Sequence, residues 1–496
     1  MEFCIMKFGF TRSCRSVTAA LLVCAASGTT ASASVSVAAG PYYNPATKSR
    51  YYKITGGDWT QLRAFAQSMG GDLATIEDAA ENTWVRNTVV GNNSKPFIGL
   101  NDALTEGSLV WADGSSSAFR AWRVGEPQNT ASKDYVRYDG QAAGTWEIVT
   151  VAFSPEAVVE IKPVNGEQAP IRVPSEQPTI PAGILAANQA DAKEVVLASG
   201  TYTLTSDISV FGRTLRGAGV GQTTLFMPTG SSPGMSVGGN AAVQDLTIVN
   251  RSSGPSAVVF SGANRIRRVE FTSTLGTADG PLLEFSGSSS SGTTVIDSCV
   301  FNTSEYALEH EYGELAVLNT IFRDLGAVSK NGGSSGTLRM SNCVFTRCGP
   351  GPQFQFGPDA FVSNSIFWNN TGVIGTSVRY CIGAGIQGPT NLDADPKFVN
   401  DAGNDFRLRP DSPAIDRGAV ADFAACLPED LVDFAGNPRA IDVPSVPNYT
   451  ASVTPIDLGV FEFTPVACPG DLNGDGLVED SDFQIFVVWY NQLVCP

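Results

Sequence analysis

The sequence predicts a multidomain protein with an α+β domain, an all-β right-handed parallel β-helix, and a small α-helical tail behind an acidic loop. Helix periodicity followed by short strand patterns indicates the α+β domain at residues 41–162. A strand motif that recurs about every 22 residues indicates the β-helix at residues 181–463. Closely spaced acidic residues before an amphipathic stretch mark the tail at residues 464–496.

Residues 1–33 are predicted to be a secretory signal peptide. Lys7, Arg12 and Arg15 precede a short apolar run, and Ala31-Ser32-Ala33 fits a small-residue cleavage site. No later stretch reaches the ~20 apolar residues that a membrane-spanning helix needs. We therefore expect an exported protein without a transmembrane segment, either secreted or attached to the cell envelope.

The chain is acidic, with 49 Asp and Glu against 32 Lys and Arg and a net charge of −17. This balance argues against a nucleic-acid partner, because nucleic acids are bound by basic surfaces. Three of the ten cysteines, Cys4, Cys14 and Cys24, lie in the signal segment. The remaining cysteines are odd in number and widely spread, which is not the pattern of a dense disulfide framework.

The α+β domain begins with two predicted helices. Leu62, Phe65, Ala66 and Met69 follow helical spacing, and Gly70-Gly71 ends this first helix. A second helix is expected at about residues 78–89, with Thr75 as its N-cap. Short strands follow, with the sequences PFIGLND, LVWADGS, DYVRY, GTWEI and AVVEI.

The order of four motifs in this domain resembles that of the C-type lectin-like family. The motifs are Phe97–Asp102, Trp111–Gly114, Gly125–Asn129 and Trp146, and they follow the two helices. Family members that bind sugar hold calcium with an E-P-N type tripeptide and a W-N-D tripeptide. The resemblance therefore implies an α+β lectin-like fold and a carbohydrate ligand.

The candidate ligand-binding residues are Glu126, Gln128, Asn129 and Glu147. Glu126-Pro127-Gln128 keeps an acid and an amide, but Trp146-Glu147-Ile148 has Glu for Asn and Ile for Asp, which removes one expected carboxylate. Three interpretations stay open. The loop is packed around a cis-proline-type turn without metal, it holds a weakened calcium and sugar site, or it binds protein without calcium.

A Pro-rich linker is predicted at residues 163–180. Polar residues separate its prolines, so we expect an extended, semi-stiff spacer and a domain boundary. The prolines of this stretch and its end are Pro163, Pro170, Pro174, Pro178 and Pro181.

The repeat in the following domain has one apolar anchor in each coil, at successive spacings of 23, 30, 21, 23 and 22 residues. One short strand in each coil at this period fits a right-handed parallel β-helix, with Phe stacked on Phe inside. Cys299 and Cys343 would then lie about 10 Å apart, too far for a disulfide. The anchors are Ile248, Phe271, Phe301, Phe322, Phe345 and Phe367.

Both ends of this domain resemble known β-helix proteins. The stretch from Ile180 to Gly219 is similar to the cap helix, first strands and L-R-G-A-G turn of pectin-lyase-like proteins. The stretches DADPKFVNDAGNDFRLRPDSPAIDRGA, DFAGNPR and PIDLGVFEF resemble the last coils of bacterial β-helix proteins. The resemblance implies a fold and leaves activity open.

Evidence for an enzyme is weak. Pectate lyases and polygalacturonases of this fold use calcium with a basic residue, or clustered Asp with a G-H-G stretch, and this sequence has no G-H-G. Glu309, His310 and Glu311 are the weak catalytic candidates, and a solvated acidic loop between coils is the competing interpretation. We favour a binding protein, with a polysaccharide lyase or glycoside hydrolase as the alternative.

Four outward apolar positions line up on successive coils, at Val300, Ile321, Val344 and Ile366. Such a stripe is typical of an interface. A loop or the C-terminal segment covers it, or it is a docking face for the lectin-like domain or for a glycan stacked on Trp368.

The tail carries a calcium-type loop followed by a helix at about Phe483 to Tyr490. Glycine at loop position 6, Gly476, permits the sharp turn, and Asp stands where an ordinary EF-hand has Glu. The predicted Ca²⁺ ligands are Asp471, Asn473, Asp475, the Leu477 carbonyl, Glu479 and Asp482.

This tail resembles a dockerin repeat, although only one loop is present. Cys468 and Cys495 bracket the loop, as in the GC-type dockerin-like tails of exported bacterial proteins. The resemblance implies a Cys468–Cys495 disulfide and a cohesin-like or envelope receptor. Cys348, Cys381 and Cys426 are left without an assigned partner.

Together these features predict an exported bacterial modular protein that binds at the cell surface or in the extracellular matrix, with glycan as the favoured ligand. The first alternative is a polysaccharide-degrading enzyme that uses the β-helix groove. The second is a structural surface-layer component with a protein partner.

Overall fold

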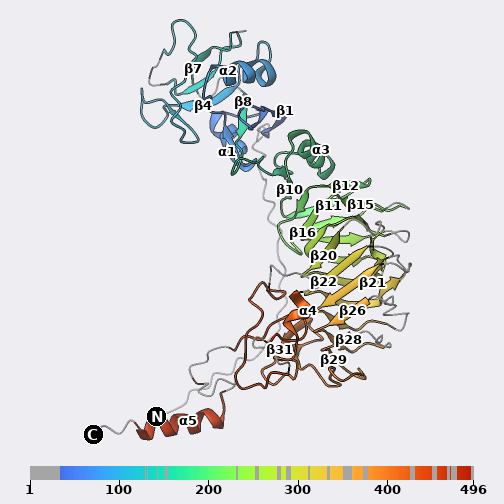
Figure 1. Ribbon diagram of the computed structural model, residues 1–496. Helices are drawn as coiled ribbons and strands as arrows, with labels where there is room; N and C mark the ends of the chain where they lie inside the picture. Colours follow the sequence, from blue (N-terminus) through green and yellow to red (C-terminus); the bar gives the residue numbers. More distant parts are fainter. Residues whose placement is uncertain are drawn as a thin grey trace, which may run out of the picture.

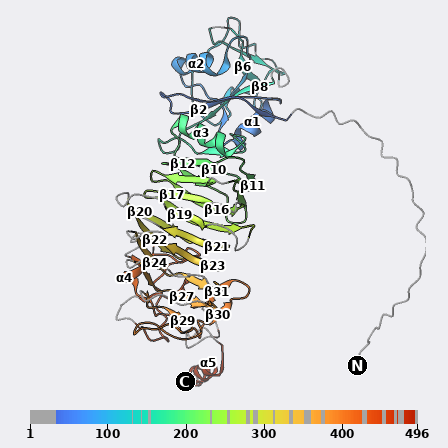
Figure 2. The same ribbon diagram turned by 90° about the vertical axis from the view of Figure 1, so that its right-hand side faces the viewer.

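The computed structural model places the α+β domain at one end of a stack of β-coils and helix α5 (Asp480–Gln492) beyond the other end (Figure 1). The view in Figure 2 shows the same order along the molecule. The predicted signal peptide lies outside the described residues. These are residues 34–465, 470 and 478–492, except for 129, 131, 142, 151–154, 231–232, 252–255, 276–280, 286–291, 311–312, 332–335, 350–359, 372–377, 425–430 and 450–454.

The α+β domain is built on a sheet of strand order β1-β2-β8-β4-β6-β7, with β3 paired to β8 and β5 to β4. Tyr51 and Tyr52 are neighbours on β2, so they point to opposite faces and enter two separate hydrophobic clusters. The strands are β1 (Ser36–Tyr43), β2 (Arg50–Thr55), β3 (Asp72–Leu73), β4 (Phe97–Asn101), β5 (Val110–Trp111), β6 (Tyr135–Tyr138), β7 (Trp146–Val149) and β8 (Glu156–Ile161).

Helix α1 (Trp59–Ser68) forms where the apolar spacing predicts it. Asp58 and Gln61 make a reciprocal capping box at its start, and Gly70 follows its end with a φ of 86°. The second helix differs from the prediction at its start. Asp78, rather than Thr75, is the N-cap of α2 (Ala79–Val85), because its side chain accepts a hydrogen bond from the Glu81 amide. A π-helical turn, η1 (Arg86–Val90), continues it.

The segment predicted as an extended, semi-stiff spacer is part of a packed junction. Strand β9 (Ile171–Val173) pairs in parallel with β10 of the solenoid. Just beyond it, the Glu176 carboxylate is fully buried against the Arg50 guanidinium of β2, at 2.9 Å. A proline-rich stretch is an extended spacer when the residues between its prolines are solvated. Here Glu176, which lies between two of the prolines, is buried in the junction.

The second domain is a parallel β-solenoid that begins with helix α3 (Ile180–Ala190). Its strands form three parallel ladders, so each central coil carries three strand segments where one was expected. The long strands β21 and β23 each serve two ladders, because left-handed residues Thr303 and Asp324 turn the chain within them.

The strands of the solenoid and of the segment that follows it have these bounds. They are β10 (Glu194–Leu197), β11 (Gly200–Thr203), β12 (Ile208–Phe211), β13 (Thr214–Arg216), β14 (Thr223–Phe226), β15 (Met235–Gly238), β16 (Ala242–Asn250), β17 (Val258–Ser261), β18 (Arg265–Ser273), β19 (Pro281–Phe285), β20 (Thr293–Asp297), β21 (Val300–His310), β22 (Glu314–Leu318), β23 (Ile321–Asn331), β24 (Thr337–Ser341), β25 (Val344–Thr346), β26 (Ala360–Ser363), β27 (Ile366–Trp368), β28 (Val378–Arg379), β29 (Ile382–Gly383), β30 (Phe398–Asn400) and β31 (Asp405–Leu408).

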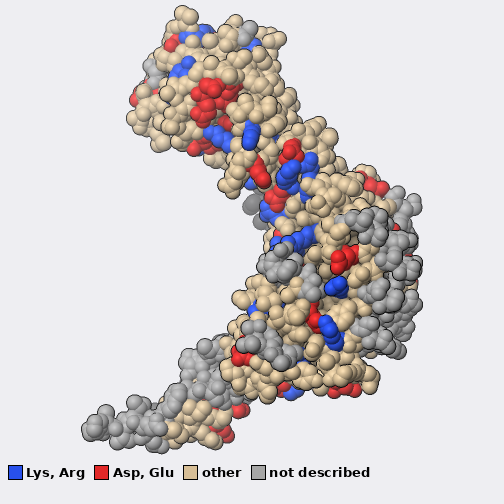
Figure 3. Space-filling model, in the orientation of Figure 1, with Lys and Arg blue, Asp and Glu red and all other residues tan. Residues whose placement is uncertain are grey.

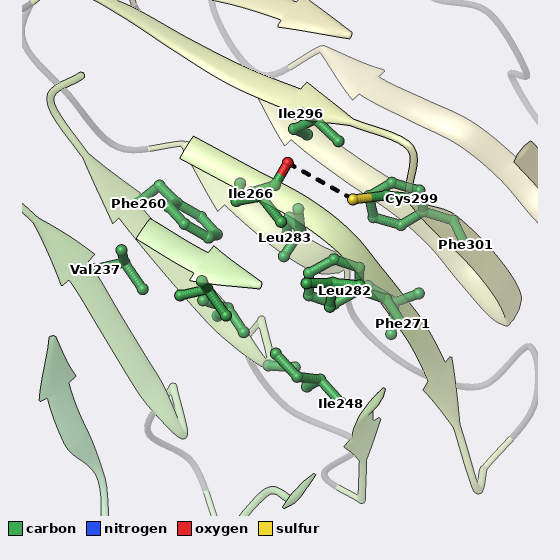
Figure 4. Packing of buried hydrophobic residues seen from close by; sticks show 14 of the residues in the cluster. Val237, Ile248, Phe260, Ile266, Phe271, Leu282, Leu283, Ile296, Cys299 and Phe301 are labelled. Atoms are coloured by element: carbon green, nitrogen blue, oxygen red, sulfur yellow. Dashed lines mark hydrogen bonds between the residues drawn. The ribbon is translucent and has the colours of Figure 1, made fainter. Parts of the chain in front are cut away.

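The predicted phenylalanine ladder is confirmed. The rings of Phe271, Phe301, Phe322, Phe345 and Phe367 stack in order, with centroids 5.0, 5.0, 5.0 and 4.6 Å apart. Figure 4 shows Phe271 and Phe301 side by side in this core. Because successive coils pair in register, the phenylalanines of neighbouring coils lie one inter-strand distance apart, which favours stacking of their rings.

The cysteines of the solenoid are buried thiols. The four cysteines that the structure describes are not in disulfides, and they are Cys299, Cys343, Cys348 and Cys381. The Cys299 sulfur lies 3.8 Å from the Ile266 carbonyl oxygen (Figure 4). The expectation that Cys299 and Cys343 are small core residues is therefore confirmed.

The apolar stripe on the outer face of the coils is covered by the C-terminal segment of the chain. Val344 and Ile366 are fully buried and Ile321 is 5% exposed, in one cluster with Phe406 and Val460. The segment that covers them contains β30, β31 and the short helix α4 (Val420–Ala424). Of the interpretations of this stripe, coverage by the chain itself is the one observed.

Buried asparagines at one corner of the coils hold this segment in place. Asn342 Nδ2 donates to the carbonyls of Asp457 (2.8 Å) and Gly459 (3.2 Å), and Asn364 Nδ2 donates to that of Ala419 (3.0 Å). Both asparagines have left-handed φ angles, of 55° and 50°, which Asn tolerates well. The corner therefore turns the coil and also binds the covering chain.

None of the helices in the part of the chain that the structure describes has the length and apolarity needed to cross a bilayer.

Candidate functional site

The candidate ligand-binding residues of the α+β domain come from two elements that lie side by side. The surface formed by Glu126, Glu147 and the cations that contact them is called the rim. Glu126 and Gln128 lie in the long connection between β5 and β6, and Glu147 lies on β7. Gln128 is exposed, whereas Asn129 lies outside the described residues.

Trp146 forms the platform beneath this rim. It is fully buried, and its indole nitrogen donates to the Asn82 side-chain oxygen at 3.1 Å. Its backbone ties the long connection to β7, since its N–H donates to the Ala121 carbonyl and its carbonyl accepts from the Arg123 N–H. Edge-to-face aromatic contacts surround it, from Trp111, Phe119, Trp122 and Tyr138.

Glu126 is held by the backbone around it. The peptide bond between Glu126 and Pro127 is cis. Oε2 of Glu126 accepts from the N–H groups of Gln128 (2.9 Å) and Ile148 (3.3 Å), and the side chain is 4% exposed. This geometry agrees with the packed-loop interpretation, in which the turn is ordered by protein contacts.

Glu147 is surrounded by three cations. Oε1 accepts from Nη2 of Arg137 at 2.8 Å, its register partner on β6, and Lys95 Nζ lies 3.6 Å away. Oε2 lies 2.9 Å from Nη1 of Arg123. The second arm of Arg123 reaches Glu126, with Nη2 at 3.3 Å from Oε1. Arg123 therefore bridges the two candidate carboxylates.

This donor set does not fit calcium. Calcium takes six to eight oxygens, whereas one oxygen of each candidate carboxylate, Oε1 of Glu126 and Oε2 of Glu147, is already held by Arg123. Ile148 supplies no oxygen from its side chain. Across the described residues, no group of three or more His, Cys, Asp or Glu is arranged to hold a metal ion.

Sequence reasoning missed Lys95, Arg123 and Arg137. Arg123 stands three residues before Glu126, so its closeness along the chain was visible in the sequence. Its contact with Glu147 depends on how the connection folds back on β7. Arg137 lies beside Glu147 through the register of β6 and β7, and Lys95 reaches it from the segment before β4.

A second buried polar group surrounds the Tyr51 hydroxyl of β2. The Tyr51 hydroxyl lies 2.5 Å from Oε1 of Glu81 and 3.1 Å from Oε1 of Glu160. Burial, and next the charge of Glu81, raise the pKa of Glu160 to about 7. Burial also raises the pKa of Glu81. One phenolic proton cannot serve both acids, which favours a protonated Glu160.

His310, the central residue of the weak catalytic candidates, is buried in the structure. His310 is 5% exposed and packs edge-on against Phe285, with ring centroids 6.1 Å apart. Residues 300–310 are strand β21, so the expectation of a solvated acidic loop is wrong for them. Glu309 pairs in register with Glu284 of β19, and Glu311 lies outside the described residues.

The solenoid has a cavity of about 470 Å³ between its strands and the covering segment. Two ion pairs line it, Asp245–Arg268 and Glu270–Arg323, beside Phe406, Phe434 and Phe461. Figure 3 shows acidic and basic side chains close together along the solenoid, not as a patch of one sign. Trp368 packs partly buried against the covered cluster.

Only the end of the predicted calcium loop is described. Asp482 is 2% exposed and its Oδ2 accepts from the Glu479 N–H at 2.9 Å. The predicted helix is confirmed as α5, with Phe483 and Phe486 exposed. The other predicted ligands and both cysteines of the predicted disulfide lie outside the described residues, namely Asp471, Asn473, Asp475, Leu477, Cys468 and Cys495.

Comparison with known proteins identifies relatives of the α+β domain. Residues 56–151 match the sequence model of the family described as the lectin C-type domain. Lectin BRA-3 of Megabalanus rosa is 34% identical over 93 residues, which are 18% of this chain and 56% of that protein. C-type mannose receptor 2 of Rattus norvegicus is 27% identical over 23% of this chain, and the match spans only 8% of the receptor.

Among solved structures, the carbohydrate-recognition domain of the mouse scavenger receptor C-type lectin is 23% identical. It aligns with 25% of this chain and 98% of its own, with a TM-score of 0.22.

Proposed function

We propose that this protein, which combines a C-type lectin domain at residues 56–151 with a parallel β-solenoid, binds carbohydrate outside the cell. The observation that carries the proposal is the meeting of Glu126 and Glu147 at one rim of the lectin domain. They come from the long connection and from β7, at the two positions that the family resemblance assigns to the E-P-N type and W-N-D motifs. A relative described as a lectin, BRA-3, supports the ligand class.

The solenoid acts in this proposal as a stiff support. The buried Arg50–Glu176 pair and the β9–β10 pairing support a fixed joint between the lectin domain and the first coils. Carbohydrate bound at the rim is then held at the end of the molecule opposite helix α5 (Figure 1). Among the described residues, the buried His310 argues against the alternative of polysaccharide cleavage at the candidate triad.

The tail supplies attachment in this proposal, through a single calcium-folded loop. Its predicted ligands include Glu479 and Asp482, which close the loop at the start of α5. Calorimetric titration of the full chain is expected to show calcium binding that an Asp471→Ala variant loses. Absence of calcium binding by the unmodified chain would remove this part of the proposal.

Carbohydrate binding is tested by measuring adsorption of the full chain to immobilised polysaccharides and to a glycan array. A Glu126→Gln/Glu147→Gln variant is expected to bind at least about tenfold more weakly, a change of about 1.4 kcal/mol. Glu106→Gln removes an exposed carboxylate from the same domain and serves as the matched control. Equal binding by the double variant and the control would contradict the assigned rim.

A further inference from the structure

We infer that the Arg123 guanidinium takes the structural place of calcium in the lectin domain, so that this rim binds an acidic saccharide without metal. The inference rests on the proposed carbohydrate binding, which it deepens by naming the ligand class. The geometry that carries it is the double contact of one guanidinium with Glu147 (2.9 Å) and Glu126 (3.3 Å).

Each of the four carboxylate oxygens of Glu126 and Glu147 has a partner in the protein. Oε2 of Glu126 accepts two backbone N–H groups, and Oε1 of Glu147 accepts from both Nε and Nη2 of Arg137. The remaining oxygen of each carboxylate is the one that Arg123 contacts. A calcium ion that used these two carboxylate oxygens would have to displace the guanidinium.

The side chains of Glu126 and Glu147 are 4% and 8% exposed, so their charges need partners. Arg123, Arg137 and Lys95 supply three positive charges to these two carboxylates. The charges of both carboxylates are thus neutralised by cations of the protein itself.

Two cations of the rim are open to a ligand. The side chains of Arg123 and Lys95 are each 44% exposed, and both groups are donors without acceptor capacity. A planar guanidinium matches a carboxylate or a sulfate well. The ligand is therefore a saccharide with an anionic group, either a uronate or a sulfate ester.

Metal independence is tested by hydrogen–deuterium exchange of the full chain in calcium and in EDTA. The readout is local, since peptides covering residues 118–130 and 143–150 report on the rim and separate it from the calcium-type tail. Their exchange is expected to be the same in both buffers. Calcium-induced protection of either peptide would overturn the inference, whatever the tail does.

Ligand class is tested by binding of the full chain, in EDTA, to polygalacturonate, to a sulfated polysaccharide and to neutral mannan. Binding to at least one acidic polymer is expected, with at least tenfold weakening in Arg123→Gln and in Lys95→Gln. Arg123→Lys should recover part of the loss. Arg120→Gln removes the same charge from the same connection without touching either carboxylate, and it should bind as the unmodified chain does.

The outcomes separate the inference from the proposed function. Calcium-dependent binding of mannan alone would overturn the inference and leave carbohydrate binding intact. No binding to any saccharide would overturn both, while the exchange experiment would still decide the role of Arg123. Preference between polygalacturonate and the sulfated polymer identifies the anionic group.

Discussion

Arg50 and Glu176 form a fully buried ion pair, with Nη2 and Oε1 2.9 Å apart, between β2 of the lectin domain and the segment that enters the solenoid. The Tyr52 hydroxyl donates to the same carboxylate at 2.5 Å, and the Arg172 N–H donates at 3.0 Å. Arg50 also donates to the Pro170 carbonyl. Each of these buried charges is stabilised by the other. Because Arg50 belongs to the lectin domain and Glu176 to the segment that enters the solenoid, the pair links the two domains.

Replacing Glu176 by Gln is expected to destabilise the chain by about 3–5 kcal/mol, because it leaves the Arg50 charge buried without a counter-ion. Chemical denaturation followed by tryptophan fluorescence measures the change in the first transition. Glu167→Gln, an exposed acid in the same segment, should change stability by less than about 0.5 kcal/mol. Similar small effects for both variants would show that the joint is not held by this pair.

Truncation of Phe322 to Ala is expected to cost about 3–5 kcal/mol, since the ring is fully buried and stacks 5.0 Å from both Phe301 and Phe345. Thermal unfolding of the solenoid measures the loss. Phe211→Ala is the control, because that ring is 53% exposed. A stable Phe322→Ala variant would contradict the role of the ladder.

Stability of the lectin domain is expected to fall as pH rises from about 4.5 toward 7. The folded pKa of Glu160, about 7, lies above its ordinary value of 4.5, so the folded state binds more protons in this window. Tyr51 and Glu81 face this carboxyl group, and Lys162 partly opposes the shift. The full effect is about 3 kcal/mol. Denaturation at several pH values should show this slope, and Glu160→Gln should flatten it.

The four described cysteines are expected to resist thiol reagents in the folded protein. Burial raises the pKa of Cys348 and of Cys381 to about 12, and it also raises that of Cys299. Buried, protonated thiols react slowly. Alkylation at pH 8, mapped by mass spectrometry with and without denaturant, should modify these sites only after unfolding. Rapid labelling of Cys299 in the native chain would contradict the packed core.

The solenoid core was predictable because each coil repeats one register. Ile248 and the five phenylalanines recur at nearly constant spacing, and period-two alternation then assigns them to the inside. The coverage of Ile321 and Val344 was left open, since it depends on a segment that returns from far along the chain. The side chains of Asn342 and Asn364 hold this segment by donating to its backbone carbonyls. Backbone carbonyls occur in every residue, so these partners have no sequence signature.

At the rim of the lectin domain, too, some residues were predictable from the sequence and others depend on tertiary contacts. The order of the motifs along the sequence was sufficient to identify Glu126 and Glu147 as candidates. The role of Arg123 was not predicted, since it follows from the backbone hydrogen bonds between the connection and Trp146. The buried Glu176 was likewise hidden in a stretch whose prolines indicate a spacer.

The most direct test of the account is a structure of the full chain with an acidic oligosaccharide, prepared in EDTA. We expect the anionic group within hydrogen-bond distance of Arg123 and Lys95, with Arg123 still bridging Glu126 and Glu147. A metal ion between the two carboxylates, or a saccharide bound away from this rim, would contradict it.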